Sequence, residues 1–410
     1  MPRTHTRRQI YRRRRVAVFG GAALVLATAF YLPLTLLAPL QAVDATIAPY
    51  PTPAVSQPAL TFPGYGAAAI GAVGYPGVLA ASGVADPLPI ASIAKVITAL
   101  VVLDAKPLAP GEAGPDIVFG EADLGFTAQM LALDGVVEGV SAGQVMSQRD
   151  VLNVMLLTSA NNYAMSLANW AFGSIEGYVA AAGAWLAREG LTATVITEPT
   201  GIQASDVSSA ADLVEIARRV IADPVLAEIV ATPAMEVAGL GAIENRNGLL
   251  GVDGIDGIKT GTLDESGACL LFSWDHAVGS QTVTLVGVVL GGPDHATIDA
   301  AIRQLLGEVD AGFSEVTLAT QGQPFASYRT AWGDEARAVA AETTTAAVWA
   351  ATTVQAAVAA GDVTLGEVGT EVGTVTFNVA ERTFTVPLVL DTTIDDPGPW
   401  WRLTNPDKLF

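Results

Sequence analysis

The longest apolar run of the sequence lies close to its amino terminus. Residues 16–40 carry no charge, and residues 3–15, which precede them, are rich in arginine. A helix of 25 residues spans about 37 Å, against about 30 Å for the hydrocarbon core of a bilayer. Because arginine clusters remain on the cytoplasmic side, the pattern predicts a cytoplasmic tail at 1–15, a transmembrane anchor at 16–40 and an exported body. A cleaved signal peptide ending near Ala42 is the alternative interpretation, and it exports the same body.

The remaining hydrophobic pattern changes from helical to β-like along the chain. Prolines between residues 49 and 63 predict an extended linker at 41–61. Apolar residues then recur at helical spacing at 90–103, 150–157, 164–170 and 294–307. Further apolar runs indicate strands at 268–274, 281–290, 370–378 and 382–390. The change of pattern predicts a mixed helix-and-sheet domain at 62–312 and a β-rich carboxyl-terminal domain at 313–410.

Composition limits the class of function. Hydrophobic residues make up 51% of the chain and charged residues 15%, which is typical of a folded globular protein. Acidic residues outnumber basic ones by 41 to 21, and seven of the basic residues lie within the first fifteen positions. Such an acidic body repels phosphate backbones, so nucleic acid is excluded as a partner. Cys269 is the single cysteine and the three histidines lack metal-ligand spacing, so we expect no internal disulfide, metal or cofactor.

The first candidate motif is Ser92-Ile93-Ala94-Lys95, at the start of the predicted helix 90–103. Three positions separate the serine from the lysine, so one helical turn places both side chains on one face. A lysine with apolar neighbours loses its proton more easily, which a general base requires. An amphipathic helix with one snorkelling lysine explains the same residues. Lysine usage favours chemistry, because the chain has only four lysines, at positions 95, 106, 259 and 408, and otherwise uses arginine.

The second candidate motif is Ser159-Ala160-Asn161, between the predicted helices 150–157 and 164–170. A break between two helices can direct a hydroxyl and an amide into a cleft. A simple helix cap uses the same residue types, so this motif is weak by itself.

The third candidate motif is Lys259-Thr260-Gly261-Thr262, shortly before the predicted strand 268–274. We expect an antiparallel meander in which the motif occupies an edge-facing strand. The glycine would let a substrate backbone approach closely, and the two threonines offer hydroxyl and N–H donors. A turn at the end of a strand explains the motif without any function.

Ser-x-x-Lys, Ser-x-Asn and Lys-Thr-Gly, in this order, resemble the signature of penicillin-recognising serine enzymes. The flanking sequence is similar to the low-molecular-mass D-alanyl-D-alanine carboxypeptidases of peptidase family S11. The stretches that carry this similarity are 91–99, 156–162, 199–202, 245–250 and 256–262. The resemblance implies an α/β fold of the penicillin-binding-protein and β-lactamase-like transpeptidase type. In this fold an antiparallel sheet is flanked by helices, and a small carboxyl-terminal β-rich domain follows.

The resemblance also implies catalysis by acyl transfer. Ser92 would attack the bond between the two terminal D-alanines of a peptidoglycan stem peptide, and neutral Lys95 would accept its proton. Backbone N–H groups of Ser92 and Thr262 would form the oxyanion hole. Ser159 and Lys259 would relay a proton to the leaving D-alanine.

Substrate binding is implied for the remaining motif residues. Asn161 would hold the acyl amide, while Thr260 and Thr262, with Lys259 behind them, would receive the terminal carboxylate; Gly261 would let the substrate backbone approach. A β-lactam would acylate the same serine as an inhibitor. The resemblance thus predicts a serine-type D-Ala-D-Ala carboxypeptidase, and the apolar run at 16–40 places it on the outer side of the cell membrane, held there by a single pass.

The sequence departs from the family at the carboxylate site. Leu263 stands where many members have threonine. Many members also have an arginine near the substrate carboxylate, yet no Lys or Arg occurs here between Lys259 and Arg303. Only His276 and His295 could take its place.

Two other classes of function stay open at this point. A β-lactamase-like hydrolase shares the three motifs but needs a second base, and Glu198 lies in a suggestive position. However, Pro199-Thr200-Gly201 follows it, as expected of the carboxypeptidases. A non-catalytic protein that binds the cell wall or acts as a scaffold is the second class. Trp400 and Trp401 would either pack on the β-rich domain or dock on a partner or on lipid headgroups.

Overall fold

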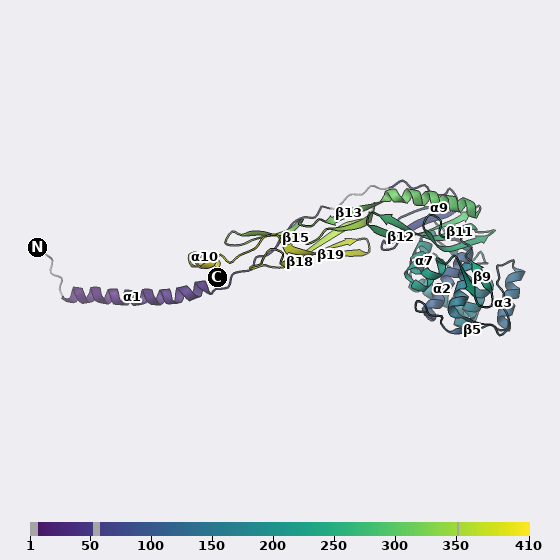
Figure 1. The fold of residues 1–410 in the computed structure, drawn as a ribbon, viewed down its shortest axis with the longest axis horizontal. Helices are drawn as coiled ribbons and strands as arrows, with labels where there is room; N and C mark the ends of the chain where they lie inside the picture. The colour runs from purple at the N-terminus through teal and green to yellow at the C-terminus, as the bar shows by residue number, and fades with distance from the viewer. Residues whose placement is uncertain (1–6, 52–57, 351) are drawn as a thin grey trace.

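The chain forms an elongated molecule in this computed structural model, which describes residues 7–51, 58–350 and 352–410. Residues 1–6 of the predicted tail and 52–57 of the predicted linker lie outside the described residues. Figure 1 shows a long helix at one end, a narrow β-rich part in the middle and a broad part of helices and sheet at the other end. We call residues 62–312 the body and residues 313–410 the stalk.

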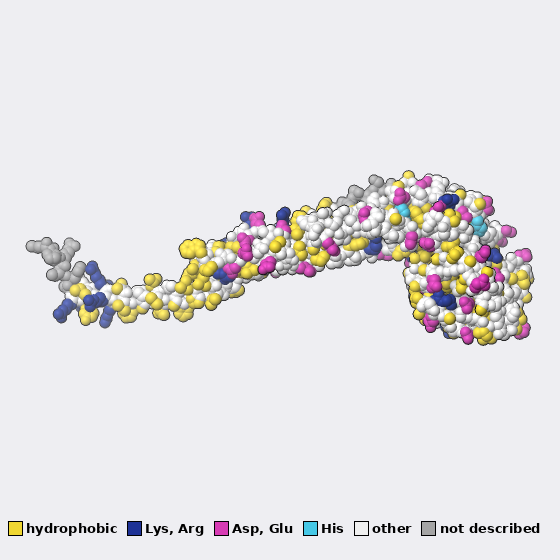
Figure 2. All heavy atoms as spheres, in the orientation of Figure 1, with side chains coloured by type: hydrophobic (Ala, Val, Ile, Leu, Met, Phe, Trp, Pro, Cys, Tyr) yellow, Lys and Arg dark blue, Asp and Glu magenta, His cyan; other side chains and the backbone are white. Residues whose placement is uncertain are grey.

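The amino-terminal helix α1 (Arg7–Leu36) contains most of the predicted membrane span. It is long and apolar enough to cross a membrane. Its large side chains point outward, with Phe19 71% and Phe30 76% exposed. Figure 2 shows basic side chains gathered at the start of this helix and apolar ones along the rest of it. Exposed apolar surface of this extent is stable in lipid and costly in water.

The centre of the body is a five-stranded antiparallel sheet with the order β10-β11-β12-β2-β3. The third motif lies on β10, which is an edge strand, as predicted. The bounds of the five strands are β2 (Ala67–Ala72), β3 (Ala80–Gly83), β10 (Ile255–Leu263), β11 (Gly267–Val278) and β12 (Gln281–Gly292).

Alternating side chains of the sheet face two different layers of helices. On β11, Cys269 and Leu271 join one apolar core with the helices of one face, whereas Leu270 and Phe272 join a second core with α9. Figure 1 shows α9 along one side of the sheet and α2 and α7 on the other. The helices are α2 (Ala94–Ala105), α3 (Glu121–Ala132), α4 (Gln148–Leu157), α5 (Asn161–Phe172), α6 (Ile175–Arg188), α7 (Ala210–Ala222), α8 (Pro224–Val230) and α9 (His295–Val309).

Short elements connect these layers. Three two-stranded pairs lie among the helices: β4 (Leu88–Pro89) with β7 (Val207–Ser208), β5 (Asp116–Val118) with β6 (Val145–Ser147), and β8 (Ala234–Val237) with β9 (Gly241–Glu244). Two 3₁₀ turns, η1 (Ala91–Ile93) and η2 (Asp310–Gly312), precede α2 and follow α9. The pairing of β4 with β7 matters for function because it fixes the segment just before the first motif.

The stalk forms a six-stranded antiparallel sheet with the order β1-β14-β15-β19-β18-β17, next to the pair β13-β16; strand β1 comes from the segment that precedes the body. Its core combines aliphatic, small and aromatic residues, among them Leu388, Ala338 and Phe377. The strands are β1 (Thr46–Ile47), β13 (Phe313–Ala319), β14 (Pro324–Arg329), β15 (Glu335–Ala340), β16 (Thr344–Trp349), β17 (Val354–Ala360), β18 (Glu371–Val379) and β19 (Arg382–Leu390).

Part of the predicted linker packs on the stalk. Strand β1 pairs with β14, and the ring of Tyr50 stacks on Phe325 at a centroid distance of 6.3 Å. At the far end of the stalk, α10 (Gly398–Thr404) lies against the end of α1, and η3 (Pro406–Lys408) follows it. The hydroxyl of Tyr31 donates to the carbonyl of Leu403 at 2.6 Å. The stalk is therefore attached directly to the helix that would span the membrane.

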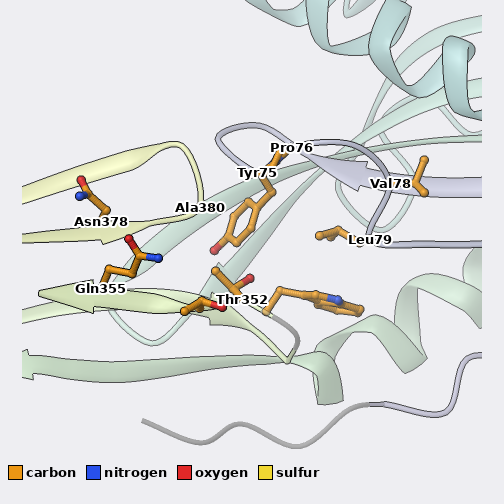
Figure 3. Close-up of a pocket in the computed structure, with 10 residues that line it drawn as sticks. Tyr75, Pro76, Val78, Leu79, Thr352, Gln355, Asn378 and Ala380 are labelled. Atoms are coloured by element: carbon orange, nitrogen blue, oxygen red, sulfur yellow. The ribbon is translucent and has the colours of Figure 1, made fainter. Parts of the chain in front are cut away.

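The stalk contacts the body through the tip of the hairpin formed by β18 and β19. The guanidinium of Arg382 lies over the ring of Tyr75 at 4.8 Å, and it also donates to the carbonyl of Ala347. The Tyr75 hydroxyl donates to the same carbonyl at 2.6 Å. Figure 3 shows this ring in the hollow between Ala380 on the hairpin and Thr352 on the neighbouring segment. This hollow contains no residue of the three motifs.

Candidate active site

Ser92 and Lys95 are in direct contact at the start of α2. Ser92 lies in η1 and α2 begins two residues later, so the predicted single helix 90–103 is a 3₁₀ turn followed by an α-helix. Ala91 has a φ of +46°, which a regular helix cannot contain, so no α-helix can include Ala91 and run on through Ser92. Lys95 Nζ lies 3.0 Å from Ser92 Oγ and 2.6 Å from the carbonyl oxygen of Thr200.

The surroundings of Lys95 favour a neutral amine. The side chain is fully buried, and burial lowers the pKa of Lys95 to about 7. The negative charges of Glu198 and Asp206 raise this pKa and the positive charge of Arg246 lowers it, but burial has the largest effect. Near neutral pH, much of the lysine can therefore accept a proton from the serine 3.0 Å away.

The second motif lies where α4 ends and α5 begins. Ser159 has a φ of +64° and is buried, and Asn161 is the first residue of α5, so this helix begins earlier than the predicted 164–170. The backbone N–H of Asn161 donates to the carbonyl of Val136 at 2.7 Å. Its side-chain Oδ1 is buried and has no hydrogen-bond partner among the described residues. A buried amide oxygen without a donor is rare in folded proteins, and a substrate N–H fits this requirement.

The third motif brings β10 against the segment that carries Ser92. A Cβ on Gly261 would lie 3.0 Å from the carbonyl oxygen of Ile90 and 3.2 Å from the backbone nitrogen of Ser92. Any residue other than glycine at this position would force β10 or the turn that contains Ser92 to shift. The backbone N–H of Ser92 thus lies beside the strand that contains Thr260 and Thr262.

Lys259 is the second buried lysine of the site. Its side chain is 2% exposed, and Nζ donates to the carbonyl of Thr260 at 3.2 Å. Burial lowers the pKa of Lys259 well below its ordinary value, and the nearby charges of Lys95 and Arg246 lower it further. The charge of Lys95 thus acts on Lys259, which places the two buried lysines in one electrostatic environment.

The two histidines that could bind a carboxylate lie in different places. His295, the first residue of α9, has Nε2 2.7 Å from the hydroxyl oxygen of Thr262. His276 is buried in β11, where its ring lies tilted against that of Trp274 at 4.7 Å and its Nε2 lies 3.2 Å from Asp310. Burial lowers the pKa of His276. Of the two histidines, His295 is therefore the one that contacts the third motif.

Arg246 and Thr200 belong to the site although we predicted no role for them. The backbone N–H of Arg246 donates to the carbonyl of Leu157, two residues before Ser159, and its charge acts on both buried lysines. The carbonyl of Thr200 accepts from Lys95. The sequence contained a signal for each, since both lie in stretches that carry the family resemblance, 245–250 and 199–202.

The geometry defines a class of protein, namely serine enzymes that use a buried lysine as the base for acyl transfer. The chain belongs to the D-alanyl-D-alanine carboxypeptidase family, peptidase S11, whose model matches residues 75–294. The predicted family is thereby confirmed. The matched range contains all three motifs and His276, and it ends one residue before His295.

Curated relatives agree with this family. The chain is 36% identical over 192 residues to the D-alanyl-D-alanine endopeptidase of Pseudomonas aeruginosa, which is 45% of this chain and 58% of the relative. It is 35% identical over 153 residues to the D-alanyl-D-alanine carboxypeptidase DacB2 of Mycobacterium tuberculosis, covering 36% and 47%. For DacD of Salmonella typhimurium the identity is 27% over 252 residues, covering 60% and 62%. The chain spans about half the length of the curated relatives it matches.

Solved structures confirm the predicted fold class. A peptidoglycan synthesis regulatory factor, PBP3, from Streptococcus pneumoniae matches with a TM-score of 0.61 at 21% identity, over 82% of this chain and 100% of its own. Penicillin binding protein 5 from Haemophilus influenzae gives 0.58 at 21% identity, over 83% and 100%. A Streptomyces K15 DD-transpeptidase gives 0.53 at 20% identity, over 60% and 96%. At these identities the likeness concerns the fold alone.

Proposed function

We propose that this protein is a serine-type D-alanyl-D-alanine carboxypeptidase that removes the terminal D-alanine from peptidoglycan stem peptides. One observation carries the proposal: a fully buried lysine, Lys95, lies 3.0 Å from the hydroxyl of Ser92. In a peptidase S11 member this arrangement supports a serine nucleophile with a neutral amine as its base.

The first half-reaction forms an acyl-enzyme. Ser92 Oγ attacks the carbonyl carbon of the penultimate D-alanine while its proton passes to Lys95 Nζ. The negative charge on the carbonyl oxygen is stabilised by the backbone N–H groups of Ser92 and Thr262, at about 3 kcal/mol for each donor. The C–N bond then breaks, and Ser159 with Lys259 delivers a proton to the leaving amine of D-alanine. Close packing of β10 on the Ser92 segment supports this assignment.

Binding of the stem peptide uses the remaining motif residues. Asn161 Oδ1 accepts from the amide N–H of the acyl part, which would give this buried oxygen a partner. Thr260, Thr262 and His295 receive the terminal carboxylate. The contact between His295 Nε2 and the Thr262 hydroxyl supports this role and replaces the arginine that the family resemblance implied. In the second half-reaction water hydrolyses the ester and releases the trimmed stem. A β-lactam acylates Ser92 by the same attack and leaves slowly.

The contacts of Glu198 argue against a β-lactamase-like role. Its carboxylate accepts hydrogen bonds from the backbone N–H groups of Thr200 and Ile202 and from the Thr200 hydroxyl. A base that activates water needs a free oxygen directed at the ester. An endopeptidase is a closer second candidate, because relatives at 36% and 34% identity carry that name. The same acyl transfer would then cleave a cross-link rather than a terminal D-alanine.

We further propose that α1 anchors the protein in the cytoplasmic membrane, with its arginine-rich start inside and the body outside. The exposed apolar surface and the charge asymmetry of α1 support this arrangement. Contacts between Tyr31 and Leu403 and between Arg402 and the carbonyl of Ala38 support an uncleaved helix. Signal cleavage near Ala42 would remove both contacts.

D-alanine release tests the proposed activity. Purified full-length protein is incubated with a diacyl-Lys-D-Ala-D-Ala tripeptide, and in parallel with a cross-linked stem dimer, beside the Ser92→Ala variant. Release from the tripeptide by the wild type alone supports the carboxypeptidase. Cleavage of the dimer without release from the tripeptide favours the endopeptidase. No cleavage of either by folded protein contradicts both and favours a wall-binding or scaffolding role.

A further inference from the structure

A fully buried aspartate lies behind the active site, and the mechanism above does not use it. Asp206 has no exposed surface and forms no ion pair with any described residue. The backbone N–H and hydroxyl of Thr197 donate to Oδ1 at 2.6 and 2.7 Å, while Oδ2 is buried without a partner among the described residues. Burial and the charge of Glu198 raise the pKa of Asp206 to about 7. Burying a carboxyl group with an unpaired oxygen costs free energy, so Asp206 is a candidate for a functional role.

Asp206 also reaches the first motif through its backbone. Its carbonyl accepts from the N–H of Ile90 at 3.0 Å, two residues before Ser92. The carboxyl group and the nucleophile are therefore held by the same pairing of β4 with β7.

Glu198 determines the position of the carbonyl that binds Lys95. One carboxylate oxygen accepts from the N–H of Thr200 at 2.7 Å, and the other accepts from the N–H of Ile202 at 2.8 Å. These two bonds clamp the turn on both sides of the peptide group between Thr200 and Gly201. The oxygen of that peptide group is the one 2.6 Å from Lys95 Nζ.

The same turn is also in close contact with Ala91, the residue before Ser92. Gly201 has a φ of +75°, and a Cβ there would lie 1.9 Å from the carbonyl oxygen of Ala91. Ala91 itself has the φ of +46° that interrupts the helix before Ser92. A shift of the turn would therefore move the base and the nucleophile together.

We propose that Glu198 and Asp206 form a carboxyl pair that positions Lys95 toward Ser92 through the carbonyl of Thr200. Glu198 is a positioning residue here, since it acts through the turn and touches no reacting atom. This assignment rests on the proposed acyl-transfer function and extends it to a pair that the three motifs do not contain.

The pair also acts on the base electrostatically. Four charged groups lie around Lys95: Glu198 and Asp206 raise its pKa, Arg246 lowers it, and Lys259 is near enough for the charge of Lys95 to lower the pKa of Lys259. Removing the charge of Glu198 should therefore lower the pKa of Lys95, by less than the full effect of that charge because Asp206 then ionises more readily. The acid limb of the acylation rate then moves to lower pH, although the loosened turn lowers the maximal rate.

The test measures acylation of the full-length protein by a fluorescent penicillin between pH 5 and 9. We expect Glu198→Gln to lower the maximal acylation rate constant by about 10- to 100-fold, as for a base that is misplaced by a fraction of an ångström to 1 Å. We also expect its acid limb at lower pH than in the wild type. Asp206→Asn keeps an acceptor for Thr197, and Asp206 is only partly charged near pH 7, so we expect a smaller shift in the same direction and a smaller loss of rate.

Glu228→Gln is the matched control, because Glu228 is 61% exposed and pairs with Arg149 away from the site. It should leave the rate and the profile unchanged. A wild-type rate in Glu198→Gln, or a lower rate with an unshifted acid limb in both variants, would overturn the assignment. If Glu198→Gln does not fold, the profile of Asp206→Asn decides alone. Absence of acylation in the wild type would instead refute the proposed function, so the two failures are distinguishable.

Discussion

The imidazole Nε2 of His295 lies 2.7 Å from the hydroxyl oxygen of Thr262, although 33 positions separate the two residues. Strand β12 ends at Gly292, so its return along the sheet brings the start of α9 to the strand pair that contains the third motif. This contact supplies a hydrogen-bonding group where the sequence lacks a lysine or an arginine.

His295 should therefore determine recognition of the substrate carboxylate. We expect His295→Ala to lower kcat/KM for the tripeptide roughly 10- to 100-fold, in line with a hydrogen bond to a charged group. The loss should vanish for a tripeptide whose terminal carboxylate is amidated. His276→Ala is the matched control and should leave recognition unchanged, since His276 packs against Trp274 and Asp310. Equal losses on both peptides would assign His295 a structural role only.

The pKa of Lys95 predicts the pH dependence of acylation. Because the neutral amine accepts the proton and burial lowers the pKa of Lys95 to about 7, the active form is lost as the pH falls through 7. We expect the rate of penicillin acylation to fall about tenfold for each pH unit well below this value. Stopped-flow measurement with a fluorescent penicillin gives the midpoint. Lys95→Arg should not be acylated at any pH, because arginine stays protonated.

Substitution of Gly261 tests whether acylation requires the close approach of β10 to Ser92. A Cβ there would lie 3.0 Å from Ile90 O and 3.2 Å from Ser92 N, so Gly261→Ala must push the strand outward. We expect acylation to slow at least tenfold while thermal unfolding changes little. Gly183→Ala in α6 is the control, because nothing lies within 4 Å of its Cβ. It should leave acylation unchanged and raise stability by about 0.5–1 kcal/mol.

The contact between α10 and the end of α1 predicts the level at which the stalk meets the membrane. Helix α10 packs on α1 at Tyr31, one turn before the helix ends, and Trp400 on α10 is 78% exposed. In a spanning α1 this level corresponds to the interface with the headgroups, where tryptophan is favourable.

A polarity-sensitive dye on the Trp400→Cys variant of the full-length protein in vesicles measures this position. The native Cys269 is fully buried and should not react. We expect blue-shifted emission and quenching by spin-labelled lipid for the dye at position 400. We expect neither for a dye on Val118→Cys in the body, where Val118 is 65% exposed. Emission typical of water at both positions would place α10 away from the bilayer.

Elements with a strong local pattern could be predicted from the sequence. The strand predicted at 382–390 is β19 with the same bounds, because large apolar side chains occupy every second position from Phe384 to Leu390. The helix at 294–307 differs from α9 by one or two residues at each end, since its apolar face and the cap at Asp294 are both local signals.

Contacts between distant segments could not be predicted in the same way. Strand β1 has two residues and no hydrophobic pattern, so its pairing with β14 depends on the folded stalk. The choice between His276 and His295 required the return of β12, which no local pattern encodes. The proposed carboxyl pair behind Lys95 could not be predicted either: the sequence singled out Glu198 only as a candidate second base, and its bonds to the backbone N–H groups of the turn depend on the folded structure.

The most direct test of the central claim is the site of covalent attachment. The full-length protein is incubated with benzylpenicillin at pH 8, quenched and digested, and the peptides are analysed by mass spectrometry. We expect one penicilloyl ester, located on Ser92, which is absent from Ser92→Ala and Lys95→Arg. An ester on another serine, or no ester on protein that is folded, would contradict the assignment of Ser92 as the nucleophile.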